Sequence, residues 1–147
     1  MRIDGGCHCG NIRYEAEVDL STVVICHCTD CQTFSGSPFR TIVQTKPNTF
    51  RLLSGTPKVY IKTTADSGNK RQQTFCPECA TPLYSAPADG NTKVVVLRVG
   101  SIRQRAELVP QDQYWFRSAQ PWLAKLPTLK RQDKQPVFDA SGALRRS

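Results

Sequence analysis

The sequence predicts a single domain that is mainly β. Three observations support this prediction. Apolar and polar side chains alternate with a period of two over much of the chain, ten prolines occur with no long amphipathic helical stretch, and seven cysteines fall into three tight groups. At 147 residues the chain is long enough for one modest hydrophobic core, which bound metal would reinforce.

Each predicted strand is a short alternating or apolar segment bounded by turn residues. The first spans residues 12–18, where four apolar residues alternate with charged ones. The apolar run from Val94 to Val99 is the best candidate for a central strand. The remaining predicted strands are residues 23–25, 39–43, 50–53, 59–63, 72–75 and 83–84. Short helical turns are expected near residues 29–34 and 120–123.

The cysteines form two outer pairs and one inner triplet. These groups are Cys7 and Cys9, then Cys26, Cys28 and Cys31, then Cys76 and Cys79. Cysteines separated by one or two residues can direct their sulfurs to one point, as tetrahedral zinc with Zn–S distances of about 2.3 Å requires. The outer pairs together supply four thiolates for a closed site, whereas the triplet supplies three and leaves one position open.

Disulfides are the main alternative to metal binding, and the sequence argues against them. The number of cysteines is odd, and neighbouring cysteines are poorly placed for the Cα separation and torsion of a disulfide. Residues 1–6 lack the apolar core of a secretory signal, so we expect a reducing, cytoplasmic setting, where these spacings are typical of metal ligands. Redox-active thiols are a further alternative.

The outer pairs predict a structural zinc site. Because the two pairs lie far apart in sequence, metal binding would close a long loop and restrict the unfolded chain strongly. Gly10 follows the first pair and can adopt the positive φ that suits a metal knuckle. Ala80 follows the second pair, and at positive φ it would carry strain of about 1 kcal/mol.

The triplet has two interpretations. It is either a second structural site, completed by a histidine or a remote carboxylate, or a site with an open fourth position. His8 and His27 each lie between two cysteines, which hinders ligation of the same metal, and Asp30 is more typical of a turn cap. We favour the open position. Three thiolates would give zinc a net charge of about −1, which suits binding of a thiol better than activation of water.

The formal net charge of +8 overstates the attraction of this chain for nucleic acid. Seven thiolates holding two Zn²⁺ ions would lower it to about +5. The basic residues near the end of the chain are Lys125, Lys130, Arg131, Lys134, Arg145 and Arg146. We predict a zinc-binding domain over residues 1–125 and a solvated basic tail over residues 126–147, with no nucleic-acid partner. The apolar runs are too short to span a membrane, so no membrane association is expected.

Longer motifs around the cysteines resemble the glutathione-dependent formaldehyde-activating family, which includes relatives of centromere protein V. The matching segments are Gly6-Cys7-His8-Cys9-Gly10, Cys26-His27-Cys28-Thr29-Asp30-Cys31, Phe34-Ser35-Gly36-Ser37-Pro38-Phe39, Phe75-Cys76-Pro77-Glu78-Cys79-Ala80-Thr81-Pro82-Leu83, and Trp115 with Pro121-Trp122. Ala80 stands where relatives usually have glycine, and residues 111–114 stand where they often have a histidine. Three cysteine groups in the same order make the resemblance specific over most of residues 5–122.

The resemblance implies an Mss4-like fold of coiled antiparallel sheets stapled by zinc. It also implies a structural zinc on Cys7, Cys9, Cys76 and Cys79 and a catalytic-type zinc on Cys26, Cys28 and Cys31. The associated activity is a carbon–sulfur lyase or synthase reaction that joins glutathione to formaldehyde and gives S-(hydroxymethyl)glutathione.

Residues and resemblance together favour an enzyme that joins a glutathione-like thiol to a small aldehyde such as formaldehyde. Hydroxyl and backbone N–H groups around Ser35, Gly36 and Ser37 could stabilise the developing alkoxide, although an ordinary Ser-Gly turn is an equal alternative. Arg40 could pair with glutathione carboxylates, although the default expectation is an arginine exposed on a strand. The aromatic residues that could wall the pocket, or belong to the core, are Phe34, Phe39, Trp115 and Trp122.

A different class of function is a non-catalytic, zinc-stapled module that binds protein or nucleic acid. The basic tail supports it, but no aromatic residue occurs among those basic residues before Phe138, and base stacking needs such residues. A reactive thiol centre on the triplet is a third hypothesis. Neither the partner molecules nor the oligomeric state follows from the sequence.

Overall fold

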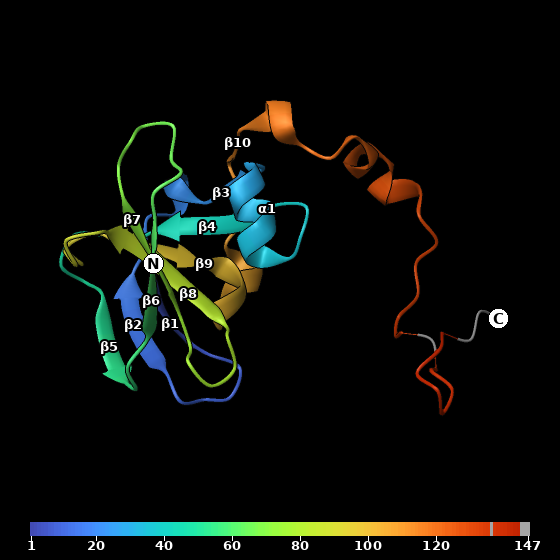
Figure 1. The fold of residues 1–147 in the computed structure, drawn as a ribbon, viewed down its shortest axis with the longest axis horizontal. Helices are drawn as coiled ribbons and strands as arrows, with labels where there is room; N and C mark the ends of the chain where they lie inside the picture. The colour runs from blue at the N-terminus through green and yellow to red at the C-terminus, as the bar shows by residue number, and fades with distance from the viewer. Residues whose placement is uncertain (136, 145–147) are drawn as a thin grey trace.

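The protein, a computed structural model described over residues 1–135 and 137–144, confirms the predicted mainly β fold (Figure 1). A three-stranded sheet has the order β1-β2-β5 and a seven-stranded sheet the order β10-β3-β4-β9-β8-β7-β6. The strands of the small sheet are β1 (Arg2–Gly6), β2 (Arg13–Glu17) and β5 (Arg51–Ser54). Those of the large sheet are β3 (Val24–Cys26), β4 (Arg40–Gln44), β6 (Lys58–Lys62), β7 (Arg71–Phe75), β8 (Pro82–Pro87), β9 (Val96–Arg98) and β10 (Asp112–Tyr114).

All eight predicted strands are present, within a few residues of their expected ends, and β9 occupies the predicted central position of the large sheet. Two strands were not predicted. β1 contains one buried apolar residue, Ile3, and two glycines, so its own pattern is weak; it forms by pairing with β2. β10 is short and polar, and it pairs with β3 in parallel. The large sheet is therefore antiparallel except at this edge, where the β3–β10 pair is parallel.

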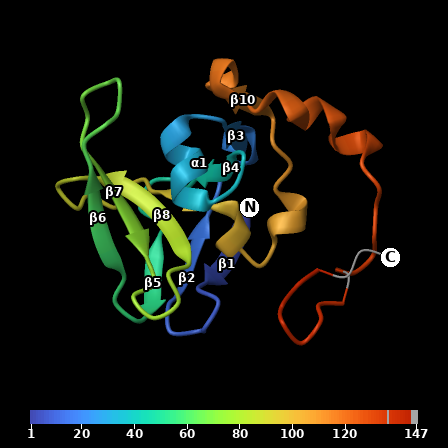
Figure 2. The ribbon, with the colours of Figure 1, turned by 45° about the vertical axis from the view of Figure 1, so that its right-hand side comes forward.

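The core lies on one face of the large sheet, against the small sheet. Tyr14 and Ala16 alternate inward along β2, and Val43 of β4 is directly opposite Leu97 of β9. All four side chains are buried in one cluster. Successive side chains in a strand point to opposite faces, so the remaining side chains of these strands lie on the other face of the large sheet, away from the core. That second face carries the helix α1 (Thr29–Ser35), which lies beside β4 (Figure 2).

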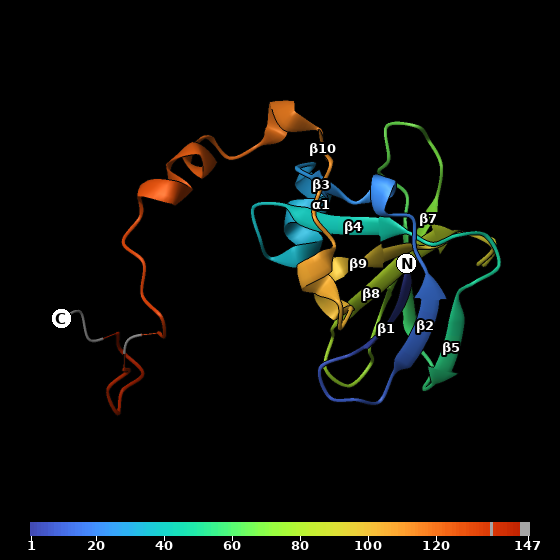
Figure 3. The same cartoon turned by 180° about the vertical axis from the view of Figure 1, so that it is seen from behind.

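Five short 3₁₀ helices accompany the strands in the described ranges: η1 (Leu20–Thr22), η2 (Val99–Ser101), η3 (Arg105–Glu107), η4 (Phe116–Ser118) and η5 (Pro121–Thr128). The predicted turns at 29–34 and 120–123 correspond to α1 and the start of η5. Residues 119–135, which follow η4, extend away from the sheets, as Figures 1 and 3 show from opposite sides. The boundary predicted after residue 125 falls inside η5, and Arg145 and Arg146 lie outside the described residues.

In the part of the chain that the structure describes, no helix combines the length and the apolar character needed to cross a bilayer.

Candidate functional site: two cysteine clusters

The seven cysteines gather into the two clusters that the sequence predicts. In the outer cluster, Cys7, Cys9, Cys76 and Cys79 place their sulfur atoms within 4.8 Å of one another. The Sγ atom of Cys9 lies 3.5 Å from that of Cys7 and 3.7 Å from that of Cys76. Four sulfurs around tetrahedral zinc would lie about 3.8 Å apart, given a Zn–S distance of about 2.3 Å. The outer cluster therefore fits a four-thiolate metal site.

Each outer pair lies in a tight turn of similar design. The N–H of Cys7 donates to Ile12 O, and the N–H of Cys76 donates to Thr81 O, both at 3.0 Å. Gly10 and Ala80 occupy the same place in the two turns, and both have positive φ, at 82° and 57°. Ala80 therefore has the positive φ at which the sequence analysis expected strain, and this conformation costs about 1 kcal/mol.

The inner cluster forms where β3 ends and α1 begins. Cys26 is the last residue of β3, and Cys28 is the N-cap of α1, accepting a hydrogen bond from Cys31 N at 3.2 Å. The helix then returns Cys31 toward the same point, because three residues are nearly one helical turn. The three sulfurs lie within 4.8 Å of one another. A short run of sequence thus provides three ligands that could hold a metal ion.

Among the described residues, no histidine or carboxylate completes the inner cluster. His27 is 2 % exposed, and its Nε2 atom lies 2.8 Å from Gln113 Oε1, while its Nδ1 atom has no partner. Asp30 accepts hydrogen bonds from Lys62 at 2.6 Å and from Thr64 at 2.8 Å. Neither His27 nor Asp30 belongs to the group of side chains that converges on the inner cluster, so a fourth position is open to an external ligand.

Two thiols of the inner cluster, those of Cys26 and Cys31, have pKa values shifted in opposite directions. The Cys31 thiol donates to Cys26, which lowers the pKa of Cys26 to about 5 and raises that of Cys31 well above its usual value. The hydrogen bond from Cys31 therefore favours the thiolate form of Cys26. Asp30 is also held ionised, because the hydrogen bond from Lys62 lowers its pKa.

A hollow of about 490 Å³ opens beside Cys28. We call it the Cys28 hollow; its lining includes Cys28, Thr29, Asp30, Lys62, Thr64, Trp115 and Arg117. The backbone of Trp115 has a φ of 57°, in the left-handed region, and the Arg117 guanidinium lies 4.8 Å from its ring centroid. Such strain in a bulky residue is typical of a functional position.

The approach of Trp115 and Arg117 to the inner cluster depends on β10. The N–H of His27 donates to Tyr114 O at 3.0 Å, and the Gln32 side chain of α1 donates to Ser118 O at 3.0 Å. These bonds hold the segment after β10 against α1. Sequence reasoning named Trp115 as a possible pocket wall, and the structure places it in the lining of the Cys28 hollow. Lys62, Thr64 and Arg117 were missed because no motif joins these distant segments.

The predicted substrate residues lie in a separate hollow of about 400 Å³, whose lining includes Ser35, Ser37 and Phe39 but not Cys28. The Ser35 hydroxyl donates to Cys31 O at 2.7 Å, and the Ser37 hydroxyl donates to Phe39 O at 2.8 Å. Gly36 ends α1 with a φ of 59°. Both hydroxyl protons thus already have acceptors in the backbone, as in a Ser-Gly turn.

Three further residues named from the sequence lie apart from the Cys28 hollow. Phe34 packs beneath the Arg40 guanidinium, which is 5.4 Å from its ring centroid. Arg40 is buried at 7 % exposure, so the expectation of an exposed strand arginine is wrong. Trp122 is 46 % exposed in η5 and lines none of the hollows described here.

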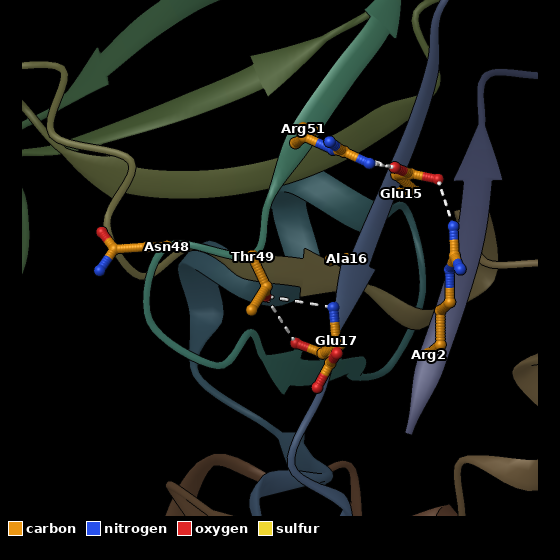
Figure 4. Close-up of a pocket in the computed structure, with 7 residues that line it drawn as sticks. All are labelled: Arg2, Glu15, Ala16, Glu17, Asn48, Thr49 and Arg51. Carbon is orange, nitrogen blue, oxygen red and sulfur yellow. Dashed lines mark hydrogen bonds and ion pairs between the residues drawn. The ribbon is translucent and has the colours of Figure 1, made fainter.

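Another hollow, of about 320 Å³, lies on the small sheet and contains no cysteine (Figure 4). Its charges satisfy one another: Glu15 pairs with Arg2 and Arg51, and Thr49 bonds the backbone of Glu17. We therefore do not assign a reaction to it.

Comparison with known proteins agrees with this geometry. A sequence model described as glutathione-dependent formaldehyde-activating enzyme matches residues 2–118, which include both cysteine clusters and the whole lining of the Cys28 hollow. The chain belongs to this family. A crystal structure of a Rhodobacter sphaeroides protein is similar in fold, with 16% sequence identity and a TM-score of 0.55 over 75% of this chain and 98% of that one. At that identity the likeness concerns the fold alone.

Proposed function

We propose that this protein is a zinc-dependent carbon–sulfur lyase or synthase that joins a glutathione-like thiol to a small aldehyde such as formaldehyde. The observation that supports it best is the inner cluster: three sulfurs converge, no fourth ligand from the described residues joins them, and Cys28 opens into a hollow. Family membership supports the same activity. A reducing cytoplasm would keep the seven cysteines in the free state that the structure shows.

In the proposed reaction, the thiol sulfur forms a bond to the aldehyde carbon while the carbon–oxygen π bond breaks, and the thiol proton ends on the new hydroxyl oxygen. Zinc bound by Cys26, Cys28 and Cys31 would supply a soft Lewis acid that stabilises the substrate thiolate. The outer cluster is assigned a structural zinc. No oxidant or reductant is needed, since the product is a hemithioacetal.

The side chains around the Cys28 hollow can position the two reactants. Lys62 and Arg117 provide positive charge on the hollow wall, where the aldehyde oxygen would gain negative charge. Lys62 is held by Asp30 at 2.6 Å, which orients its ammonium group. Trp115 contributes an apolar ring to the same lining. We assign Lys62 the role of stabilising the alkoxide.

Cobalt substitution tests the proposal directly. Glutathione should change the visible absorption of the cobalt protein, and this change should be absent in Cys28→Ser. Because the uncatalysed reaction is appreciable, the rate of exchange between formaldehyde and its glutathione adduct should be measured at equilibrium. Wild type should accelerate this exchange, Cys28→Ser should not, and Lys62→Gln should reduce it about tenfold or more.

The matched control is Lys58→Gln, which removes the same charge from the exposed start of the same strand, β6. It should exchange at the wild-type rate. Absence of any glutathione-dependent change in wild-type absorption would contradict the proposal. Salt-sensitive binding of DNA that depends on Lys130, Arg131 and Lys134 would then favour a binding module.

A further inference from the structure

The side-chain amide of Gln32, in α1, joins three parts of the chain. Its Nε2 atom donates to His27 O at 2.7 Å and to Ser118 O at 3.0 Å, and its Oε1 atom accepts from Gln120 Nε2 at 2.7 Å. Backbone carbonyls can only accept, so the orientation of the Gln32 amide is fixed. Both of its N–H donors are therefore used, one on the loop of the inner cluster and one on the last residue of η4.

Residues 114–118, which we call the wall segment, are tethered beside the inner cluster at both ends. The first carbonyl of the segment accepts from the N–H of His27 at 3.0 Å, and the last accepts from Gln32. Trp115 and Arg117, which line the Cys28 hollow, lie between these two tethers. The tethers therefore set where this side of the hollow lies relative to the three sulfurs.

Burial contributes little to the position of the wall segment. Trp115 and Phe116 are exposed, and η4 contains no buried residue. The Phe116 ring lies edge-on to His27, yet its side chain remains 66 % exposed. The ion pair between Arg117 and Asp66, at 3.7 Å, joins two exposed side chains, and such pairs contribute little to stability. Hydrogen bonds at the two ends therefore fix this segment more than apolar packing does.

The backbone at Trp115 needs such fixing. Its φ of 57° lies in the left-handed region, which is disfavoured for a bulky residue. A conformation of this kind persists only where the surrounding contacts impose it. The Arg117 guanidinium lies over the Trp115 ring, so the two side chains would move together. Loss of the tether at Gln32 would let the strained turn relax and carry both side chains away from the hollow.

We propose that Gln32 is a positioning residue for the Cys28 hollow, because it holds the wall segment so that Trp115 and Arg117 stay beside the inner cluster. This role stands on the hydrogen bonds alone. Its effect on thiol binding rests on the proposed function, since that effect requires a substrate in the hollow. Gln32 is not part of the lining of the hollow, so it acts through Arg117 rather than by contact with the substrate.

Tryptophan fluorescence tests the position of the wall segment. The chain contains two tryptophans, so Trp122→Phe leaves Trp115 as the only one. In this zinc-loaded background, Gln32→Met removes both donors and keeps a side chain of similar length that favours a helix. We expect the emission of Trp115 to shift to longer wavelength and its quenching by acrylamide to increase.

The matched control is Thr33→Val, at the next position of α1. The Thr33 hydroxyl donates within the helix, to Thr29 O at 3.0 Å, and its side chain is exposed. Thr33→Val should leave the emission and quenching of Trp115 unchanged. Gln32→Glu is a second test variant: it keeps the acceptor for Gln120 but loses both donors, so it should behave as Gln32→Met does.

Cobalt-substituted protein tests the effect on thiol binding. The glutathione concentration that gives half of the absorption change should rise about threefold to tenfold in Gln32→Met. Arg117→Met should raise this concentration as well. Gln32→Met should then add little in the Arg117→Met background, because the two residues act through the same contact with the substrate.

Four results would overturn the positioning role. One is unchanged emission and quenching of Trp115 in Gln32→Met. Another is an equal change in Thr33→Val, which would indicate a general loss of α1. The third is loss of a zinc ion from Gln32→Met, since Gln32 would then serve the inner cluster through His27. The fourth is failure of both Gln32 variants to fold, which would make Gln32 a residue for stability.

The cobalt experiment separates this role from the proposed function. Additive effects of Gln32→Met and Arg117→Met on glutathione binding would contradict the action of Gln32 through Arg117. If glutathione leaves the cobalt absorption of wild type unchanged while Trp115 emission shifts in Gln32→Met but not in Thr33→Val, the positioning role is supported and the proposed function fails.

Discussion

The outer cluster joins two turns from distant parts of the chain, whereas the inner cluster is built from six consecutive residues. Cys9 and Cys76, which lie 3.7 Å apart at their sulfurs, are separated by 67 positions in sequence. Cys26, Cys28 and Cys31 lie between one strand and the helix that follows it. A metal in the outer cluster would therefore restrict the whole fold, while a metal in the inner cluster would restrict only a local segment.

The two clusters also differ in their surroundings. Cys7 and Cys76 of the outer cluster are buried within the main core, and four ligands leave no free position. The inner cluster has three ligands, opens into the Cys28 hollow and lies on the face of the sheet away from the core. A closed site next to the core is suited to stability, and an open site next to a hollow is suited to binding a substrate.

The largest expected effect is that of Cys76→Ser. Structural zinc in small peptides binds with about 10 kcal/mol or more, which is comparable to the total stability of a domain. Because Cys76 is fully buried and links the two turns, its loss should leave the protein largely unfolded or insoluble. Circular dichroism and thermal melting measure the effect. A folded Cys76→Ser variant with the wild-type melting temperature would contradict the assignment of the outer cluster as the structural site.

Cys28→Ser should have a smaller effect on the fold and a clear effect on metal content. Serine is itself a favourable N-cap, so the hydrogen bond from Cys31 N can be kept and α1 should persist. We expect one zinc ion fewer per chain, with circular dichroism close to wild type. Metal analysis that still finds two zinc ions would show that the inner cluster is not the second site.

A chelator should remove the inner metal first. The inner site has three ligands and an open side, whereas the outer site has four ligands, two of them buried. Titration with a coloured chelator should give two phases, and the first equivalent should leave circular dichroism unchanged. Release of both ions in one phase that also unfolds the protein would contradict this order.

The smallest effects concern the two turns of the outer cluster. Gly10→Ala should lower the unfolding free energy by about 1 kcal/mol, because alanine is disfavoured at a φ of 82°. The added Cβ would meet no atom within 4 Å, so the cost is conformational. Ala80→Gly should raise the unfolding free energy by roughly 0.5 kcal/mol, since relief of strain exceeds the entropy that glycine loses. Denaturant unfolding measures both, and changes of equal sign would contradict the shared turn geometry.

The sequence by itself determined the elements that depend on neighbouring residues. Period-two alternation identified β2, and the apolar run after residue 93 identified the central strand β9. Both predictions succeed because the pattern of apolar side chains within a strand shows which of its faces are buried. The spacing of Cys26, Cys28 and Cys31 likewise predicted one convergent cluster, since ligands within one turn can meet without help from the rest of the fold.

Only the tertiary structure decided what surrounds that cluster. Strand β10 has no apolar pattern and forms by pairing with β3, and it brings Trp115 and Arg117 to the Cys28 hollow. Arg40 and Arg98 lie in strands separated by more than fifty residues, and cross-strand register places them together beside Gln73. A local pattern carries no information on which distant strands pair, because that choice depends on burial of the whole core. The same choice buried Arg40, which the sequence alone would place on the surface.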